Sequence, residues 1–183
     1  MTEHPNGPDL RELFLLFRSE DALPRCEIIP PEEMPQPYHD LLIHEQHMTV
    51  TVEAHHGDLV NVNILKNRLD GDHYARQILL TLQKSGKVVQ FGIVRVNLSF
   101  VSQEVREEIL AGKTPFGRIL INHNVLRRIE PTAYLRIYPR HVMMGWFGMS
   151  ESRPVYGRLA YIHCDGQPAI ELIEIVAPAT ERA

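Results

Sequence analysis

Hydrophobic and polar residues alternate along the middle of the chain. Residues 59–66 and 73–82 both show the period of two that is typical of a half-buried β-strand. Between them lies an Asp-Gly pair at residues 70–71, which favours a tight hairpin turn. A second turn at residues 85–87 is followed by the same alternation over residues 88–96. The pattern therefore predicts three consecutive antiparallel strands.

The C-terminal third of the chain repeats this pattern. Strands are expected around residues 126–138, 155–164 and 169–176. An Asp-Gly pair at residues 165–166 supplies the turn that joins the last two strands. The two groups together predict a six-stranded antiparallel sheet.

Four other segments have the spacing of apolar residues that is typical of amphipathic helices. They begin near Pro8, Tyr38, Ser102 and Pro115. Ser102 is a favourable N-cap, and Gly112 is a favourable residue just after a helix. Residues 48–53 fit either the continuation of the second helix or the start of a strand. Hairpins interspersed with helices predict the α+β class, with helices packed on the sheet.

Prolines divide the chain into two unequal parts. The residues that interrupt regular structure near the N-terminus are Pro24, Pro30, Pro31, Pro35 and Pro37. We therefore expect residues 1–37 to hold an N-terminal helix and a proline-rich connector. Residues 38–183 should form the main part of a single domain, because no second linker follows.

Composition and charge exclude several classes of protein. Of the 183 residues, 44% are hydrophobic and 23% are charged, which is typical of a globular domain. The formal net charge of −4 gives no overall basic field, so we expect no nucleic-acid partner. The N-terminus has no apolar signal segment, and no apolar run is long enough to span a bilayer. These features predict a cytoplasmic protein without a membrane partner.

Motifs for metals and common cofactors are missing from the sequence. His44 and His47 are three residues apart, whereas the zinc-protease helix needs a spacing of four. The two cysteines, Cys26 and Cys164, are far apart and form no CxxC pair. Glycine-rich phosphate-binding loops and the GxSxG motif of serine hydrolases are also absent. We therefore expect no metal and no cofactor.

Five short motifs resemble, in the same order, segments of the chorismate pyruvate-lyase family. They extend over about residues 38 to 180. The motifs are Lys113-Thr114-Pro115-Phe116-Gly117-Arg118-Ile119-Leu120, His47-Met48-Thr49 with Glu53, Tyr74-Ala75-Arg76-Gln77-Ile78-Leu79-Leu80, Gly157-Arg158, and Gly166-Gln167-Pro168 with Glu174-Ile175-Val176-Ala177-Pro178-Ala179. The N-terminal helix and connector are additions similar to those of the archaeal and cyanobacterial branch.

The resemblance implies both a fold and an activity. The fold is a six-stranded antiparallel sheet with helical flaps over an internal cavity, which the UTRA effector-sensing domains of GntR-type regulators share. The activity is that of a cofactor-free carbon–oxygen lyase, which converts chorismate to 4-hydroxybenzoate and pyruvate. Such an enzyme would serve the biosynthesis of ubiquinone, another quinone or another aromatic compound.

The resemblance also assigns residues to the site. Arg76 would bind the aromatic carboxylate, and Glu174 would meet the 4-oxygen of the ring, so these two are the candidate catalytic residues. Backbone groups of Met48 and Phe116 would lie at the carboxylate end of the substrate. Whether Glu174 acts as a base or only as a hydrogen-bond partner stays open.

Physical chemistry makes this pair of residues plausible. A planar guanidinium binds a carboxylate through two parallel hydrogen bonds. Glu174 shares a strand face with Leu172 and Val176, where an unpaired carboxylate would be costly. Glu174 therefore needs a partner or a function, and enclosure should raise its pKa.

Three features depart from the family pattern. Phe116 replaces the usual leucine, which would narrow the cavity. The arginine that follows the glycine of the third strand is missing, since Ile93 follows Gly92. Arg95 is a candidate for binding the enolpyruvyl carboxylate instead, and Arg158 is the alternative. Residues 139–154 form a longer segment, rich in methionine and aromatic residues.

Two alternatives to a chorismate lyase stay open. One is a stand-alone binding or sensor domain for a small aromatic acid. About 37 residues precede Tyr38, which is short for the winged helix of a GntR-type regulator, and no basic recognition helix is present. The other is a lyase that acts on a related enolpyruvyl substrate, which Phe116 and residues 139–154 suggest.

Overall fold

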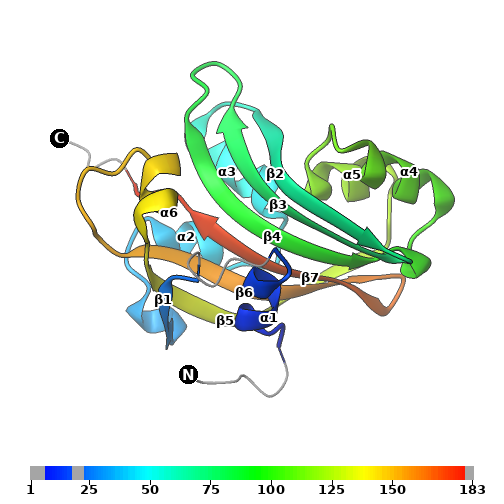
Figure 1. The fold of residues 1–183 in the computed structure, drawn as a ribbon, viewed down its shortest axis with the longest axis horizontal. Coiled ribbons are helices and arrows are strands. Elements are labelled where there is room, and N and C mark those ends of the chain that lie inside the picture. The colour runs from blue at the N-terminus through cyan, green and yellow to red at the C-terminus, as the bar shows by residue number, and fades with distance from the viewer. Residues whose placement is uncertain (1–6, 18–22, 180–183) are drawn as a thin grey trace.

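Seven strands form one antiparallel sheet in the computed structural model, which describes residues 7–17 and 23–179 (Figure 1). The strands are β1 (Arg25–Ile29), β2 (Val60–Asp70), β3 (His73–Leu82), β4 (Val88–Asn97), β5 (Arg127–Tyr138), β6 (Val155–Cys164) and β7 (Gln167–Val176). Their order across the sheet is β1-β5-β6-β7-β4-β3-β2. The two hairpin groups predicted from the sequence therefore meet where β4 pairs with β7.

The α+β class is confirmed, but the predicted count of six strands is one too low. The additional strand is β1, which lies in the predicted proline-rich connector and pairs along its whole length with β5. Pro24 and Pro30 fall just outside β1. No proline within the strand therefore removes an N–H group that β5 could accept from. Proline content indicated a connector here, while the free edge of β5 made a strand favourable.

Helices pack on both faces of this sheet. They are α1 (Leu10–Leu15), α2 (Tyr38–Leu42), α3 (Met48–His56), α4 (Gln103–Ala111), α5 (Phe116–Asn122) and α6 (His141–Trp146), with short 3₁₀-helices η2 (Pro31–Glu33) and η3 (Leu98–Phe100). The segment left undecided by the sequence is helical, since α3 begins at Met48. It ends at Gly57, whose φ of 64° suits glycine. No helix in residues 7–17 or 23–179 is long and apolar enough to cross a bilayer.

Local capping explains where α4 begins and ends. The Ser102 hydroxyl accepts a hydrogen bond from the Val105 N–H at 3.4 Å, which satisfies one of the free donors of the first turn. Gly112 ends the helix with a φ of 69°, in the left-handed region that glycine adopts without strain. Both roles agree with the sequence prediction.

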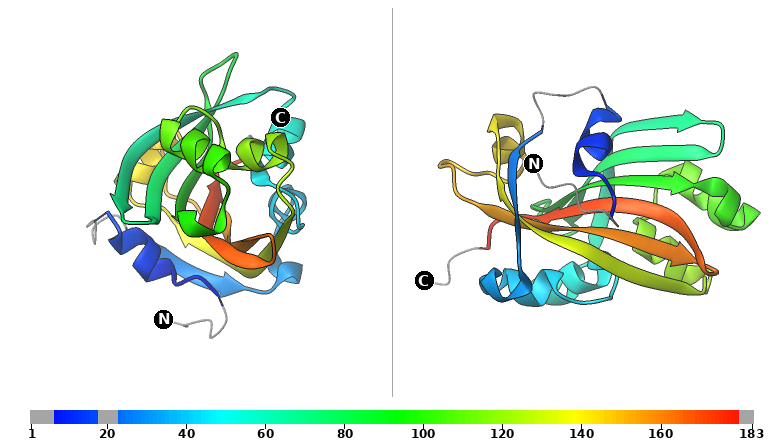
Figure 2. Two further views of the ribbon diagram at one scale, coloured as in Figure 1. Left: turned by 90° about the vertical axis from the view of Figure 1, so that its right-hand side faces the viewer. Right: turned by 90° about the horizontal axis from the view of Figure 1, so that it is seen from below.

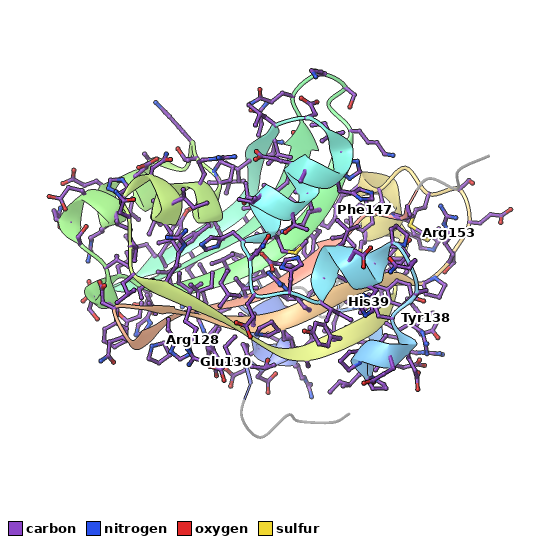
Figure 3. All side chains as sticks on the ribbon, turned by 180° about the vertical axis from the view of Figure 1, so that it is seen from behind. His39, Arg128, Glu130, Tyr138, Phe147 and Arg153 are labelled. Carbon is purple, nitrogen blue, oxygen red and sulfur yellow. The ribbon has the colours of Figure 1, made fainter. Side chains whose placement is uncertain are left out.

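Each face of the sheet has its own layer of helices. We call the face that carries Arg76, Val94 and Leu172 the inner face, and the opposite face the outer face. Helices α2 and α3 cover one part of the inner face, and α4 and α5 cover another (Figure 2). Figure 3, seen from behind Figure 1, shows α2 with His39 in front of the sheet. On the outer face, α1 and α6 pack against Phe91.

Candidate functional site

A small cavity lies between the inner face of the sheet and helices α3 and α5. Its volume is about 40 Å³. Strands β3, β4 and β7 form its floor, while α3 and α5 form its roof. The residues that decide its chemistry are His47, Met48, Arg76, Gln90, Phe116 and Glu174.

Strand register brings the floor residues together. Arg76 on β3 pairs with Val94 on β4, which pairs with Leu172 on β7. Two residues before Val94 on β4, Gly92 pairs with Glu174 on β7. Residues two apart on a strand share a face, so Arg76 and Glu174 both belong to the inner face. Gly92 has no side chain, which leaves space between the strands on either side of it.

Arg76 is buried with most of its hydrogen-bonding capacity unused. Its side chain is 1% exposed, and Nη2 donates a hydrogen bond to the Thr114 carbonyl at 3.4 Å. Its Nε and Nη1 have no partner. The guanidinium carbon lies 5.4 Å from the centre of the Phe116 ring, a cation–π contact. Burial lowers the pKa of Arg76, and the neighbouring Tyr74 phenol opposes that shift.

Glu174 is already paired with a second buried arginine. Arg158 on β6 lies directly opposite it, and Arg158 Nε donates to Glu174 Oε2 at 2.8 Å. Burial raises the pKa of Glu174 above its ordinary value, although Arg158 acts in the opposite direction. The sequence predicted that this carboxyl needs a partner or a function, and Arg158 is such a partner.

The other donors of Arg158 hold the segment that connects α2 to α3. They bond to the carbonyl oxygens of Leu42 at 3.3 Å, His44 at 2.8 Å and Gln46 at 2.9 Å. A guanidinium with its donors committed in this way has a structural role. The predicted role of Arg158 in binding an enolpyruvyl carboxylate stays a prediction, and in this structure the donors of Arg158 bond to protein groups.

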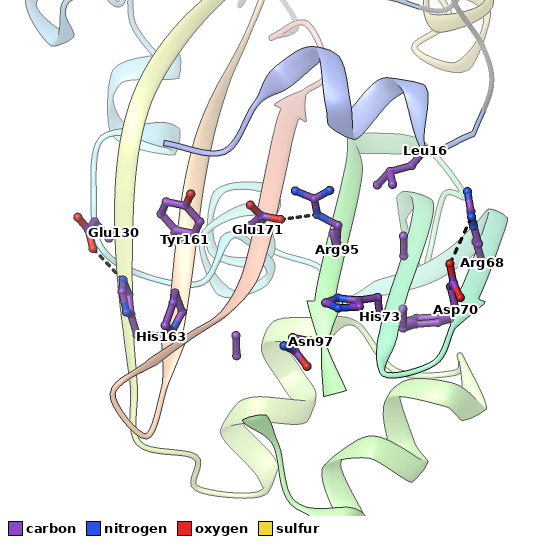
Figure 4. Close-up of a pocket in the computed structure, with 14 residues that line it drawn as sticks. Leu16, Arg68, Asp70, His73, Arg95, Asn97, Glu130, Tyr161, His163 and Glu171 are labelled. Carbon is purple, nitrogen blue, oxygen red and sulfur yellow. Dashed lines mark hydrogen bonds and ion pairs between the residues drawn. The ribbon is translucent and has the colours of Figure 1, made fainter. Parts of the chain in front are cut away.

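Arg95 does not belong to this site. It lies three residues after Gly92, and an odd separation places it on the outer face. Its Nε donates to the Glu171 carboxylate (Figure 4), and its Nη2 donates to Glu12 at 3.4 Å. Arg95 and Glu171 border a broad, open depression of about 790 Å³ on the outer face. The structure therefore places Arg95 outside the cavity, and its role in binding an enolpyruvyl carboxylate stays a prediction.

Two cavity residues were not assigned by the sequence motifs. His47 is 7% exposed and its Nε2 has no partner, and Gln90 is 3% exposed and its Oε1 has no partner. Burial, followed by the charges of Arg127 and Arg158, lowers the pKa of His47 to about 4, so its ring is neutral at pH 7. The only sequence signal for Gln90 was its place two residues before Gly92 on one strand face.

The distribution of unpartnered polar atoms singles out this cavity. Among the described residues, the buried side-chain nitrogen and oxygen atoms without a partner belong to His47, Arg76 and Gln90. All three residues line the cavity. Buried polar atoms are normally satisfied, and an exception calls for an explanation such as a ligand or water. In residues 7–17 and 23–179, no cluster of three or more histidine, cysteine or acidic side chains could hold a metal.

The cavity is too small for the predicted substrate. One water needs at least about 10–15 Å³ of such volume, so about 40 Å³ holds a few waters. An apolar cavity that binds benzene has a volume of about 150 Å³. Chorismate carries a six-membered ring and two carboxylates, and it does not fit between the sheet and the roof helices as they stand.

Comparison with known proteins gives a fold but no family. No protein-family model matches the sequence, and no curated protein is similar to it. PhnF from Mycobacterium smegmatis has a similar structure, with a TM-score of 0.56 and 10% identity over 74% of this chain. The chain spans 65% of the length of PhnF.

Two further structures are more distant. The ligand-binding domain of a protein assigned to the GntR family of transcriptional regulators, from Bordetella bronchiseptica, has a TM-score of 0.49 and 12% identity, covering 67% of this chain and 87% of that domain. YydK, a candidate transcriptional regulator from Bacillus subtilis, has a TM-score of 0.46 and 9% identity, covering 68% of this chain and 61% of YydK.

The prediction of a carbon–oxygen lyase is wrong. Within the site, the candidate base Glu174 is paired with Arg158, and the cavity is too small for chorismate. The predicted place in quinone or aromatic biosynthesis is withdrawn with the activity. The chain shares the fold of PhnF, within the α+β, UTRA-like class that the sequence predicted.

Proposed function

We propose that this chain is a sensor domain that binds a small organic acid in the cavity between the sheet and helices α3 and α5. The carboxylate of the acid binds Arg76. This is the kind of role stated for the Bordetella bronchiseptica domain, and it corresponds to the binding alternative that the sequence left open. No chemical change of the ligand is part of the proposal.

The observation that carries the proposal is the unpartnered guanidinium of Arg76. Its side chain is 1% exposed, and two of its three nitrogens have no hydrogen-bond partner. Arginine does not lose its proton in proteins, so it cannot avoid the cost of burial by becoming neutral. A bound carboxylate would supply both the missing acceptors and the missing negative charge.

The roof of the cavity supports a role in sensing. An ion pair between Arg118 and Glu53 joins helices α3 and α5. The first residues of both helices line the cavity. An acid larger than a few atoms has to displace these helices in order to enter. Occupancy of the cavity is therefore coupled to the position of α3 and α5, which a partner domain or protein can detect.

The test is a binding titration with acids of increasing size, from acetate to benzoate and 4-hydroxybenzoate, followed by calorimetry and amide NMR shifts. We expect shifts in α3, α5 and β3, and a loss of affinity of at least about tenfold in Arg76→Gln, because a buried charge pair is broken. Arg95→Gln is the matched control, since Arg95 lies on the outer face of the same sheet.

Thermal unfolding separates binding from a structural role of Arg76. The ligand-free Arg76→Gln variant should be at least as stable as the wild type, because the substitution removes an unpaired buried charge. It should gain no stability from added acid. Equal acid affinities in wild type and Arg76→Gln, or no affinity of the wild type for any of these acids, would overturn the proposal.

A further inference from the structure

Gln90 forms a second polar end of the cavity, opposite Arg76. The residue of β4 that pairs with Arg76 is Val94, and Gln90 lies four residues away from it on the same face. At about 3.3 Å per residue, this separation is about 13 Å along the strand. Both side chains line the same cavity, and both carry unpartnered atoms. The two ends differ in chemistry, because Arg76 offers donors and Gln90 offers an acceptor.

The Gln90 carboxamide needs a donor that the protein does not supply. Its side chain is 3% exposed, and its Oε1 has no partner among the described residues. A buried acceptor without a donor loses the hydrogen bonds that it would make in water and gains none in return. Glu174, also on the cavity wall, uses its Oε2 to accept from Arg158. A ligand with only a carboxylate and an apolar body would supply acceptors for Arg76 but no donor for the Gln90 Oε1.

The charges around the cavity decide which kind of donor fits. Arg76 is positive, while the pair of Arg158 and Glu174 adds no net charge. His47 is neutral at pH 7 because its pKa is lowered to about 4. The charged side chains that line the cavity, together with the partner of Glu174, therefore carry one net positive charge, which a ligand with one negative charge balances. A hydroxyl group preserves that balance, whereas an ammonium group would cancel the charge of the ligand and leave Arg76 uncompensated.

We infer that the ligand is a hydroxycarboxylic acid, whose carboxylate binds Arg76 and whose hydroxyl donates a hydrogen bond to Gln90. Gln90 is then the residue that selects the hydroxylated acid over its deoxy analogue. This inference rests on the proposed function, since it places a second group of the same ligand. Neutral His47, with its free Nε2, is positioned to make a further hydrogen bond to the ligand.

The experiment compares matched pairs of acids on the full chain. Lactate, 3-hydroxypropionate and 4-hydroxybutyrate are titrated beside propionate and butyrate, with alanine and β-alanine as zwitterionic analogues. We expect at least one hydroxy acid to bind about tenfold or more tightly than its deoxy analogue and its amino analogue. A site that hydrogen-bonds a hydroxyl discriminates strongly against ligands that lack it.

Gln90→Leu assigns that preference to one residue. The variant should lose the preference for the hydroxy acid over its deoxy analogue. An unchanged preference in Gln90→Leu, equal affinities of the two acids in the wild type, or tighter binding of the amino acid would overturn this inference alone, provided that Arg76→Gln still weakens the binding of the acids. If Arg76→Gln binds every acid as the wild type does, the proposed function fails and the inference fails with it.

Discussion

Arg158 and Glu174 lie directly opposite each other on β6 and β7, and the Arg158 Nε donates to Glu174 Oε2 at 2.8 Å. The arginine is 1% exposed and the glutamate side chain 13% exposed. Arg158 also bonds to three backbone carbonyls between α2 and α3. This pair therefore anchors the roof of the cavity to its floor.

Breaking this pair should destabilise the fold. We expect Arg158→Met to lower the free energy of unfolding by about 3–5 kcal/mol, because the substitution leaves a buried carboxylate and several carbonyls unpaired. Urea unfolding measures the change. The double variant Arg158→Met/Glu174→Leu should recover part of the loss, since no charge is left unpaired. Arg128→Met, which removes an exposed ion pair with Glu130 on β5, is the control and should cost less than about 1 kcal/mol (Figure 3).

Stability should fall in acid because of His47. The pKa of His47 is lowered to about 4 in the folded protein, compared with about 6.5 in an unfolded chain. Between these values the unfolded chain binds a proton that the folded protein does not, so stability is complete above about pH 6.5 and declines toward pH 4. At about 1.4 kcal/mol per pKa unit, the loss approaches about 3 kcal/mol.

Urea unfolding across this pH range, in wild type and His47→Asn, isolates the contribution of His47. The variant should show a shallower decline between about pH 6.5 and pH 4, and the two slopes should become equal below about pH 4. His55→Asn is the control, because His55 is exposed on the same helix, and it should keep the wild-type slope. Parallel curves for wild type and His47→Asn would rule out this role of His47.

The ion pair between Arg118 and Glu53 should slow the separation of α3 and α5 and so the entry of a ligand. Arg118 lies on α5 and Glu53 on α3, and their side chains are 34% and 13% exposed. Because the pair is partly solvated, we expect Arg118→Met to cost about 1 kcal/mol or less in stability. We expect the acid to associate several-fold faster, which NMR line shapes or stopped-flow mixing can follow.

A matched substitution tests whether the effect on ligand entry is specific to the ion pair between Arg118 and Glu53. Arg106 on α4 pairs with Asp72 at 2.6 Å, away from the cavity. Arg106→Met should leave the association rate of the acid unchanged. If both variants change that rate equally, opening does not depend on the contact between α3 and α5.

Phe116 should limit the size of the ligand. Its ring lies over Arg76 and lines the cavity, where it takes up space that an aromatic acid would need. We expect Phe116→Leu to bind benzoate more tightly and to lose about 1–2 kcal/mol of stability through the cation–π contact and packing. Phe147→Leu is the control, because Phe147 is also 9% exposed but packs on the outer face. A similar gain in benzoate affinity in both variants would contradict the role of Phe116.

The sequence alone determined the features that depend on neighbouring residues. Alternation and Asp-Gly turns predicted the strands of both hairpin groups, since side-chain period and turn conformation are local properties. The caps of α4 at Ser102 and Gly112 followed from the same kind of argument. Glu174 could be singled out because a charge on an apolar strand face is costly without a partner, whereas Arg76 was assigned by the resemblance.

Tertiary structure decided which partners those charges have. Arg158 satisfies Glu174 across two strands, while Arg95 lies on the opposite face of the sheet, and the resemblance to lyases foresaw neither arrangement. The unpartnered atoms of His47 and Gln90, together with a cavity of about 40 Å³, exist only once α3 and α5 are packed on the sheet. Whether a buried polar atom has a hydrogen-bond partner depends on how segments far apart in the chain pack together. Local sequence patterns carry no information about the spatial distance between such segments.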